Sequence, residues 1–238
     1  MLEDVTRLDH PIDVMVLIHK AFHALSLRVE ELAAESQEGG DLKEFEGAFG
    51  FWVKQLLFHA KTEDRYMTGP LEDSQPARDN ESEHDELREK GTELVEFIGK
   101  GDTAGLEEHV RAAMLALEDQ EHQQLLEKAK DIEEILKKEM GEQRVVARTR
   151  RHLYRRVMGM RILEFDHFEN EEAFVCSIVR DRLSEKQQLD IVRRLLIDDT
   201  AADPRWIIDW VAEELEPRER KLLAELEARF AQLAPAAD

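Results

Sequence analysis

The sequence predicts an all-α protein: an up-down antiparallel helical bundle with an inserted long helix and a helical C-terminal extension. Charged residues make up 37% of the 238 residues and hydrophobic residues 42%, with only 11 Gly and 6 Pro, a balance typical of long amphipathic helices. Apolar residues recur at the i, i+3, i+4, i+7 spacing of core-facing helices. No segment alternates apolar and polar residues with a period of two, so we expect no sheet.

Local signals delimit the helices of the bundle. The first is expected over about 9–36, because Asp9 suits the N-cap and Pro11 the first turn. The second is expected over 42–67, and the Gly69-Pro70 pair ends it. After a polar connection at 74–80, further helices are expected at about 81–98, 104–140 and 144–183.

Three shorter helices are expected beyond the bundle. Ser184 opens the first, and Pro217 starts the third. For the second, we expect Asp203 as N-cap and Pro204 as the first helical position. The sequence therefore predicts two domains, a helical bundle at 1–185 and a helical extension packed on it at 186–238.

Two His-x3-Glu pairs interrupt the apolar stripes of the predicted helices. His59 and Glu63 stand where their stripe requires Leu or Met, and His167 and Glu171 do the same further along the chain. A buried, unpaired carboxylate costs several kcal/mol, so such a group normally forms an ion pair or binds a metal. A His and a Glu one turn apart inside a bundle are the usual unit of a di-iron site. The alternatives are two charge pairs, or helix faces that are exposed.

Further candidate ligands can be found by asking which residues lie at the same level along the bundle axis when consecutive helices form antiparallel hairpins. Residues equally far from a turn lie level with each other, and by this measure His19 lies level with His59. We therefore prefer His19 to His23 as a ligand. The third-helix ligand stays open between His84, His122 and Glu118. The predicted metal ligands are His19, His59, Glu63, His84, His122, His167 and Glu171.

The ligand types limit the metal. Imidazoles and carboxylates without sulfur suit iron, manganese or zinc. The predicted set exceeds the four ligands that one zinc ion needs, which indicates two metal ions. Two iron ions are the commonest metal pair at such histidine-rich sites. The single cysteine, Cys176, excludes an internal disulfide and a thiolate zinc site, and we expect it to be a small core residue.

Charge and hydropathy limit the partners and the compartment. The net charge is −21, from 33 basic and 54 acidic residues, which argues against nucleic acids and anionic membranes as partners. No apolar run reaches about 18 residues, so no transmembrane helix is expected. The N-terminal residues lack the apolar region of a signal peptide, so we expect a cytoplasmic protein. Trp206 and Trp210 are expected to anchor the C-terminal helices by packing.

The motifs together resemble a known family, the hemerythrin-like or HHE cation-binding domain. The resemblance rests on the order His19, His59-x3-Glu63, His84, His167-x3-Glu171, and on the segments FHAKTEDRYM and DHFENEEAF. It covers about residues 8–185. It implies an up-down bundle that holds two iron ions as a non-heme di-iron centre, bridged by Glu63, Glu171 and an oxo or hydroxo group.

The resemblance also implies a range of functions. Members of the family bind dioxygen, sense oxygen or iron, handle nitric oxide or remove peroxide. We expect this protein to bind O2 or a related small oxidant, for oxygen or iron sensing, carriage or storage. The alternatives are an enzyme acting on peroxide or nitric oxide (NO), and a non-catalytic iron-responsive interaction module.

The predicted helix at 104–140 departs from the family pattern. It would give the helix that bears His167 the opposite direction from the family's fourth helix. Either the helix at 81–98 is a displaced insertion and 104–140 takes its place, or the centre uses five helices.

Overall fold

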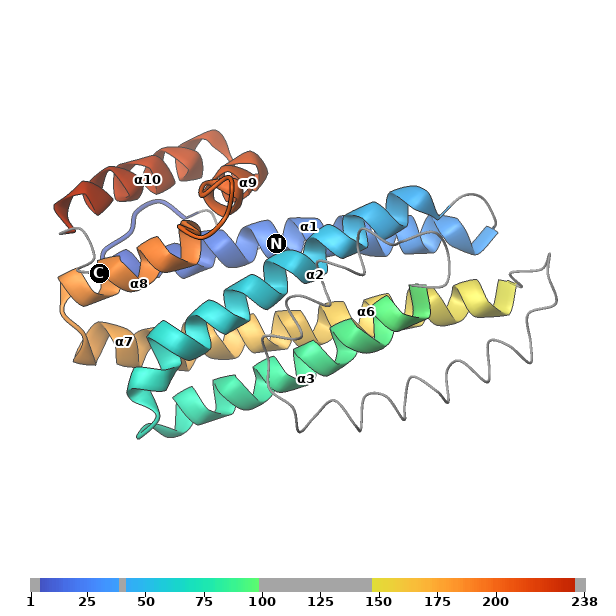
Figure 1. The fold of residues 1–238 in the computed structure, drawn as a ribbon, viewed down its shortest axis with the longest axis horizontal. Helices are drawn as coiled ribbons and strands as arrows, with labels where there is room; N and C mark the ends of the chain where they lie inside the picture. The colour runs from blue at the N-terminus through green and yellow to red at the C-terminus, as the bar shows by residue number, and fades with distance from the viewer. Residues whose placement is uncertain (1–4, 39–41, 99–146, 234–238) are drawn as a thin grey trace. The chain divides into compact units, whose positions relative to one another are not determined.

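The computed structural model describes residues 5–38, 42–98 and 147–233, and every regular element in these ranges is a helix (Figure 1). The predicted all-α bundle class is therefore confirmed. The long helices are α1 (Met15–Glu35), α2 (Lys43–Glu63), α3 (Gln75–Ile98) and α6 (Ala147–Asn170). The inserted helix predicted at 104–140, with Glu118 and His122, lies outside the described residues.

Two of the long helices continue into π-helical segments. After α2 come the π-helical η3 (Asp64–Thr68) and the 3-10 turn η4 (Gly69–Leu71). After α6 come the π-helical η5 (Glu171–Val175) and α7 (Cys176–Arg182). A 3-10 turn, η1 (Pro11–Val14), precedes α1. π-helical turns are rare in proteins, and those that occur often lie at functional sites.

The start of α3 differs from the prediction. The polar connection expected at 74–80 is wrong, because α3 begins at Gln75. Ser74 Oγ accepts a hydrogen bond from the backbone N–H of Ala77 (3.4 Å), which caps the first turn. Ala77 and Asn80 are buried at helical spacing, so the polar residues between them form the exposed face of a helix and not a loop.

The C-terminal helices are α8 (Glu185–Leu196), α9 (Trp206–Glu214) and α10 (Pro217–Ala228), followed by the 3-10 turn η6 (Arg229–Gln232). Ser184 caps α8 as predicted, in a capping box with Gln187. The predicted cap of α9 is wrong, because Arg205 is the N-cap and not Asp203. Asp203 Oδ1 instead accepts the backbone N–H of Arg205 (3.1 Å), a local turn that precedes the helix.

The chain divides into two compact units. The first comprises residues 1–24, 59–82 and 166–238, and the second comprises 25–58 and 83–165. No helix within the described ranges is both long enough and apolar enough to cross a membrane. The domain boundary expected at residue 185 stays a prediction.

Ion pairs in the first unit give the relative direction of α1 and the segment that carries Glu171. Arg180 Nε pairs with Asp13 Oδ1 (2.7 Å), and His19 Nε2 lies 3.3 Å from Glu171 Oε2. Residue numbers rise along one segment as they fall along the other, so the two are antiparallel. The segment therefore has the direction of a fourth helix in an up-down bundle. The reversed direction that the sequence suggested for it is wrong.

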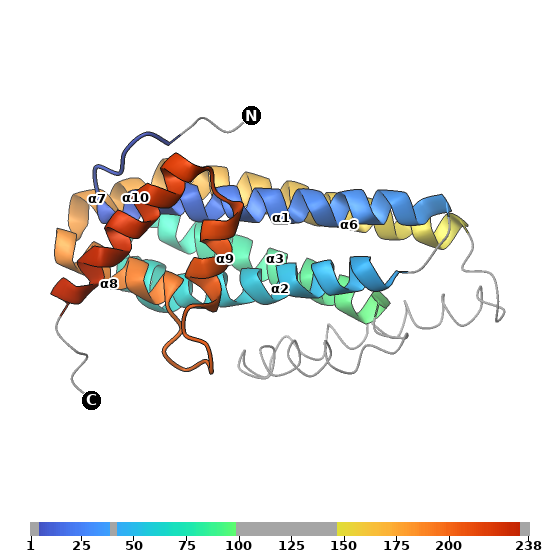
Figure 2. The same cartoon turned by 90° about the horizontal axis from the view of Figure 1, so that it is seen from above.

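Helices α8 to α10 gather beside the first half of α1 within the first unit (Figures 1 and 2). Trp210 of α9 is 5% exposed, and its ring lies edge-on to Phe22 of α1 with centroids 5.0 Å apart. Lys20 Nζ of α1 pairs with the buried Glu219 Oε1 of α10 (2.6 Å). The extension is thus attached to the turn of α1 that carries His19.

The second unit has its own core. Phe45, Phe49 and Trp52 of α2 are buried there in successive ring contacts. The indole N–H of Trp52 donates to Glu164 Oε1 of α6, and Glu164 is fully buried. On α6, Tyr154 donates a hydrogen bond from its hydroxyl to Glu30 Oε1 of α1 (3.3 Å). Polar contacts thus join the long helices in this unit.

Candidate metal centre

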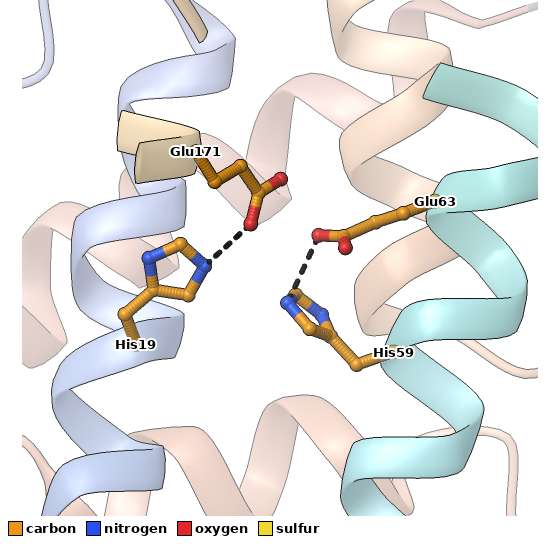
Figure 3. A group of neighbouring side chains, drawn as sticks. All are labelled: His19, His59, Glu63 and Glu171. Carbon is orange, nitrogen blue, oxygen red and sulfur yellow. Dashed lines mark ion pairs between the residues drawn. The ribbon is translucent and has the colours of Figure 1, made fainter. Parts of the chain in front are cut away.

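Four buried side chains converge in the first unit. His19 comes from α1, His59 and Glu63 from the C-terminal end of α2, and Glu171 from the first position of η5. Their exposed fractions are 1%, 3%, 0% and 0%. Each offers one ligand atom, and these four atoms all lie within 4.8 Å of one another. Figure 3 shows the carboxylates of Glu63 and Glu171 pointing toward each other, with an imidazole beside each.

The contacts within the group are short. His59 Nε2 lies 2.9 Å from Glu63 Oε1, and His19 Nε2 lies 3.3 Å from Glu171 Oε2 (Figure 3). His167 of α6 is 2% exposed, and its Nε2 lies 3.9 Å from Glu171 Oε2. A ligand atom of His167 also lies within 4.8 Å of one on Glu63. His167 therefore borders the same space as the four side chains.

The arrangement of charge favours a bound cation. Two carboxylates that are both 0% exposed face each other, and like charges in a low-dielectric interior repel strongly unless protons or cations neutralise them. Imidazole nitrogens and carboxylate oxygens are together the donor set of iron, manganese and zinc. The residues present therefore fit a site that could hold a metal ion.

His19 carries a proton when no metal is bound. Burial lowers the pKa of His19, but the hydrogen bonds and charges of Glu171 and Glu172 outweigh it and raise the pKa to about 10. The imidazolium neutralises part of the carboxylate charge in the metal-free protein. A metal that takes the Nε2 lone pair must displace that proton.

Cys176 adds no thiolate to this group. Burial raises the pKa of the Cys176 thiol well above its usual value, and the negative charge of Glu171 raises it further. The thiol therefore stays protonated, and the residue is buried in α7 as expected from the sequence.

Each facing carboxylate lies at the junction of an α-helix and a π-helical segment. Glu63 is the last residue of α2 and Glu171 the first of η5. The backbone after η3 is tight, because a Cβ on Gly69 would lie 2.5 Å from the carbonyl oxygen of Asp64. The apolar periodicity of the sequence indicated that both glutamates face the core. It did not predict the π turns, because no residue type marks the place where a turn takes an extra residue.

The remaining predicted ligands have different positions. His23 is half-buried, with its ring edge-on to Phe168 (5.7 Å), and among the described residues it does not join the ligand group. His84 is buried in α3 within the second unit, and its role as a ligand stays a prediction. His122 and Glu118 lie outside the described residues.

Two residues beside the group were not identified from the sequence. Phe168 stacks on His19 with ring centroids 4.0 Å apart and planes 7° apart, and it also lies edge-on to His59 at 5.9 Å. Glu172 Oε1 lies 2.7 Å from His19 Nδ1. The doubled glutamate in HFENEE was the available signal for the second. Phe168 and Phe22, both 1% exposed, provide an apolar wall against the imidazoles.

A comparison with protein families supports this description. Residues 10–119 match the model of the hemerythrin HHE cation binding domain. This segment is hemerythrin-like. The hemerythrin-like segment makes up slightly less than half of the chain and contains His19, His59 and Glu63. His167 and Glu171 lie beyond its end, although Glu171 meets His19 in space. No curated protein and no solved structure matches the chain.

Proposed function

We propose that this hemerythrin-like protein is a non-heme di-iron protein that binds O2 or a related small oxidant, for oxygen or iron sensing, carriage or storage. The observation that carries the proposal is the pair of fully buried carboxylates, Glu63 and Glu171, that face each other beside two imidazoles (Figure 3). Three buried imidazoles and two buried carboxylates exceed the four ligands that one zinc ion needs, and two facing carboxylates can bridge two ions.

The proposed roles follow from the positions of the donors. Glu63 and Glu171 would bridge the ions, and His19, His59 and His167 would bind through Nε2, the nitrogen that faces the carboxylates. A further ligand is proposed from the third helix, where His84, His122 and Glu118 are the candidates. When bound, iron supplies one-electron chemistry and an open position for a small ligand.

The surrounding residues would control access to that position. Phe168 stacks on His19, and Phe22 lies 5.1 Å from the ring of His59, so the imidazoles are shielded from water on these sides. The donor residues are between 0% and 3% exposed, so a macromolecule cannot contact them directly and a small molecule is the proposed ligand. We propose the cytoplasm as the compartment, because the only cysteine is buried and the fold uses no disulfide.

Anaerobic loading with Fe(II), followed by desalting and metal analysis, tests this function. We expect about two iron ions per chain for the unaltered protein. Glu63→Ala should lower the content to about one or less, because a bridging carboxylate serves both ions. Glu169→Ala is the matched control, since Glu169 is an exposed glutamate on α6. Less than about one iron per folded, unaltered chain would overturn the proposal.

A further inference from the structure

We propose that Glu172 is a positioning residue, which holds the imidazole of His19 in the orientation and tautomer that metal binding requires. The inference rests on the proposed function, since it assigns His19 as a ligand. It concerns a residue outside the predicted ligand set and outside the hemerythrin-like segment.

Two consecutive glutamates hold opposite nitrogens of one ring. Glu172 Oε1 lies 2.7 Å from His19 Nδ1, and Glu171 Oε2 lies 3.3 Å from His19 Nε2. Both glutamates belong to the first turn of η5, whereas His19 is 153 residues away from Glu172 in the chain. The ring therefore bridges the two carboxylates, with one nitrogen committed to each.

The two carboxylates have different environments. Glu171 is 0% exposed and belongs to the group of ligand atoms, whereas the Glu172 side chain is 30% exposed. Among the described residues Glu172 is not part of that group. Glu172 therefore acts on the centre through His19 and not by direct coordination.

The hydrogen bond between Glu172 and Nδ1 of His19 determines which nitrogen of the imidazole can bind a metal. A neutral imidazole has one N–H and one lone pair, and an acceptor at Nδ1 favours the tautomer with the proton on that nitrogen. The lone pair is then on Nε2, which faces Glu171. Metal-binding histidines typically donate their other N–H to such a partner, which fixes the ring and raises its basicity.

A second contact restricts the same ring. Phe168 is 1% exposed and stacks on His19 at 4.0 Å with an interplanar angle of 7°. Stacking limits tilting of the imidazole but cannot distinguish its two flipped orientations, because a half-turn of the ring about χ2 returns it to the same plane. The hydrogen bond to Glu172 supplies that distinction, so the two contacts together define one orientation.

Affinity for Co(II), measured by competition with a chelator, tests the proposal. We expect Glu172→Ala to bind about 10- to 100-fold more weakly than the unaltered protein, the usual effect of removing such a partner. Glu172→Gln should lose less, because its amide oxygen still accepts the Nδ1 hydrogen bond. Glu169→Ala and Glu169→Gln, on the exposed face of α6, are matched controls and should bind as the unaltered protein does.

A tautomer measurement separates positioning from a general structural effect. Nitrogen NMR of histidine-labelled, Zn(II)-loaded protein should show His19 protonated at Nδ1 in the unaltered chain and in Glu172→Gln. Glu172→Ala should show a weakened Nδ1–H signal, because that proton then exchanges with water. If Glu172→Ala does not fold, the affinity and NMR spectrum of Glu172→Gln decide the question.

The outcomes distinguish this inference from the proposed function. Failure of the unaltered protein to bind Co(II) and Fe(II) overturns the proposed function and this inference together. Normal metal binding by the unaltered protein, with Glu172→Ala equal to Glu169→Ala in affinity and in the His19 spectrum, overturns the inference alone. Equal losses for Glu172→Ala and Glu172→Gln, with an unchanged Nδ1–H signal, also contradict positioning.

Discussion

The indole of Trp210 lies edge-on to the ring of Phe22, with centroids 5.0 Å apart and planes 75° apart. Phe22 in turn lies 5.1 Å from the imidazole of His59. An aromatic residue of the C-terminal extension therefore supports the apolar side of the candidate metal centre through one intervening ring. The extension is part of the environment of the centre.

Replacing Trp210 should destabilise the protein strongly. Trp210 is 5% exposed, and removal of a large buried aromatic side chain costs about 3–5 kcal/mol. Urea unfolding of metal-free Trp210→Ala should show a lower midpoint than the unaltered protein. Trp206→Ala is the control, because Trp206 is only half-buried and should cost less. A larger loss for Trp206→Ala than for Trp210→Ala would contradict the assignment of Trp210 as the main anchor.

Metal binding should release a proton from His19. The pKa of His19 in the metal-free protein is about 10, above its usual 6.5, so the ring is protonated at pH 7. Because the metal needs the neutral ring, affinity should rise about tenfold per pH unit between pH 7 and 9 from this group alone. Calorimetry in two buffers of different ionisation enthalpy measures the release. The absence of any buffer dependence would refute this assignment.

The same pKa makes the metal-free protein less stable at high pH. Because the pKa of His19 is higher in the folded chain than in the unfolded chain, its protonation stabilises the folded state. This stabilisation is complete below the unfolded pKa of 6.5 and is lost as the pH rises through about 10. We expect the free energy of unfolding to fall between pH 7 and 10, measured by urea titration. His19→Gln should flatten that dependence, while His152→Gln, an exposed histidine on α6, should leave it unchanged.

Glu219 should stabilise the extension in the opposite pH range. Burial raises the pKa of Glu219, but hydrogen bonds from Lys20 and backbone N–H groups outweigh it and lower the pKa below 4.5. The contribution is therefore present above pH 4.5 and is lost as the pH falls through the folded value. Glu219→Gln should cost about 1–3 kcal/mol at pH 7 and less at pH 4.

The control for Glu219 lies on the same helix. Glu225 is exposed on α10 and pairs with Lys221 at 3.6 Å, so Glu225→Gln should change stability by less than about 0.5 kcal/mol. Urea unfolding at both pH values measures the two variants. An equal loss in both would show that the pair between Lys20 and Glu219 has no special role.

Gly69 and Gly47 should respond oppositely to alanine. A Cβ at Gly69 would lie 2.5 Å from the Asp64 carbonyl oxygen, so Gly69→Ala must shift the backbone after η3 and should cost about 1–3 kcal/mol. Gly47 has no atom within 4 Å of such a Cβ and is exposed in α2, so Gly47→Ala should stabilise by about 0.5–1 kcal/mol. Thermal unfolding of both variants tests the contrast, and a stabilising Gly69→Ala would show that η3 relaxes freely.

The start of α3 and the π-helical segments could not be predicted from the pattern of polar and apolar residues. Residues 74–80 look like a loop because most of their side chains are polar, yet the buried Ala77 and Asn80 belong to a helix that begins at Gln75. The π turns at η3 and η5 depend on a shift of backbone hydrogen bonds by one residue. Composition does not mark such a shift, since the free energy that stabilises it comes from packing.

The sequence by itself determined the all-α class and the two His-x3-Glu pairs, because both are local periodicities that chain geometry converts directly into helix faces. Only the tertiary structure decided that Glu171 faces Glu63, and that Glu172 holds His19 from the other side of its ring. Those relationships join residues far apart in the chain. They depend on helix direction, height and rotation together, which are decided by the packing of whole helices and not by any short segment.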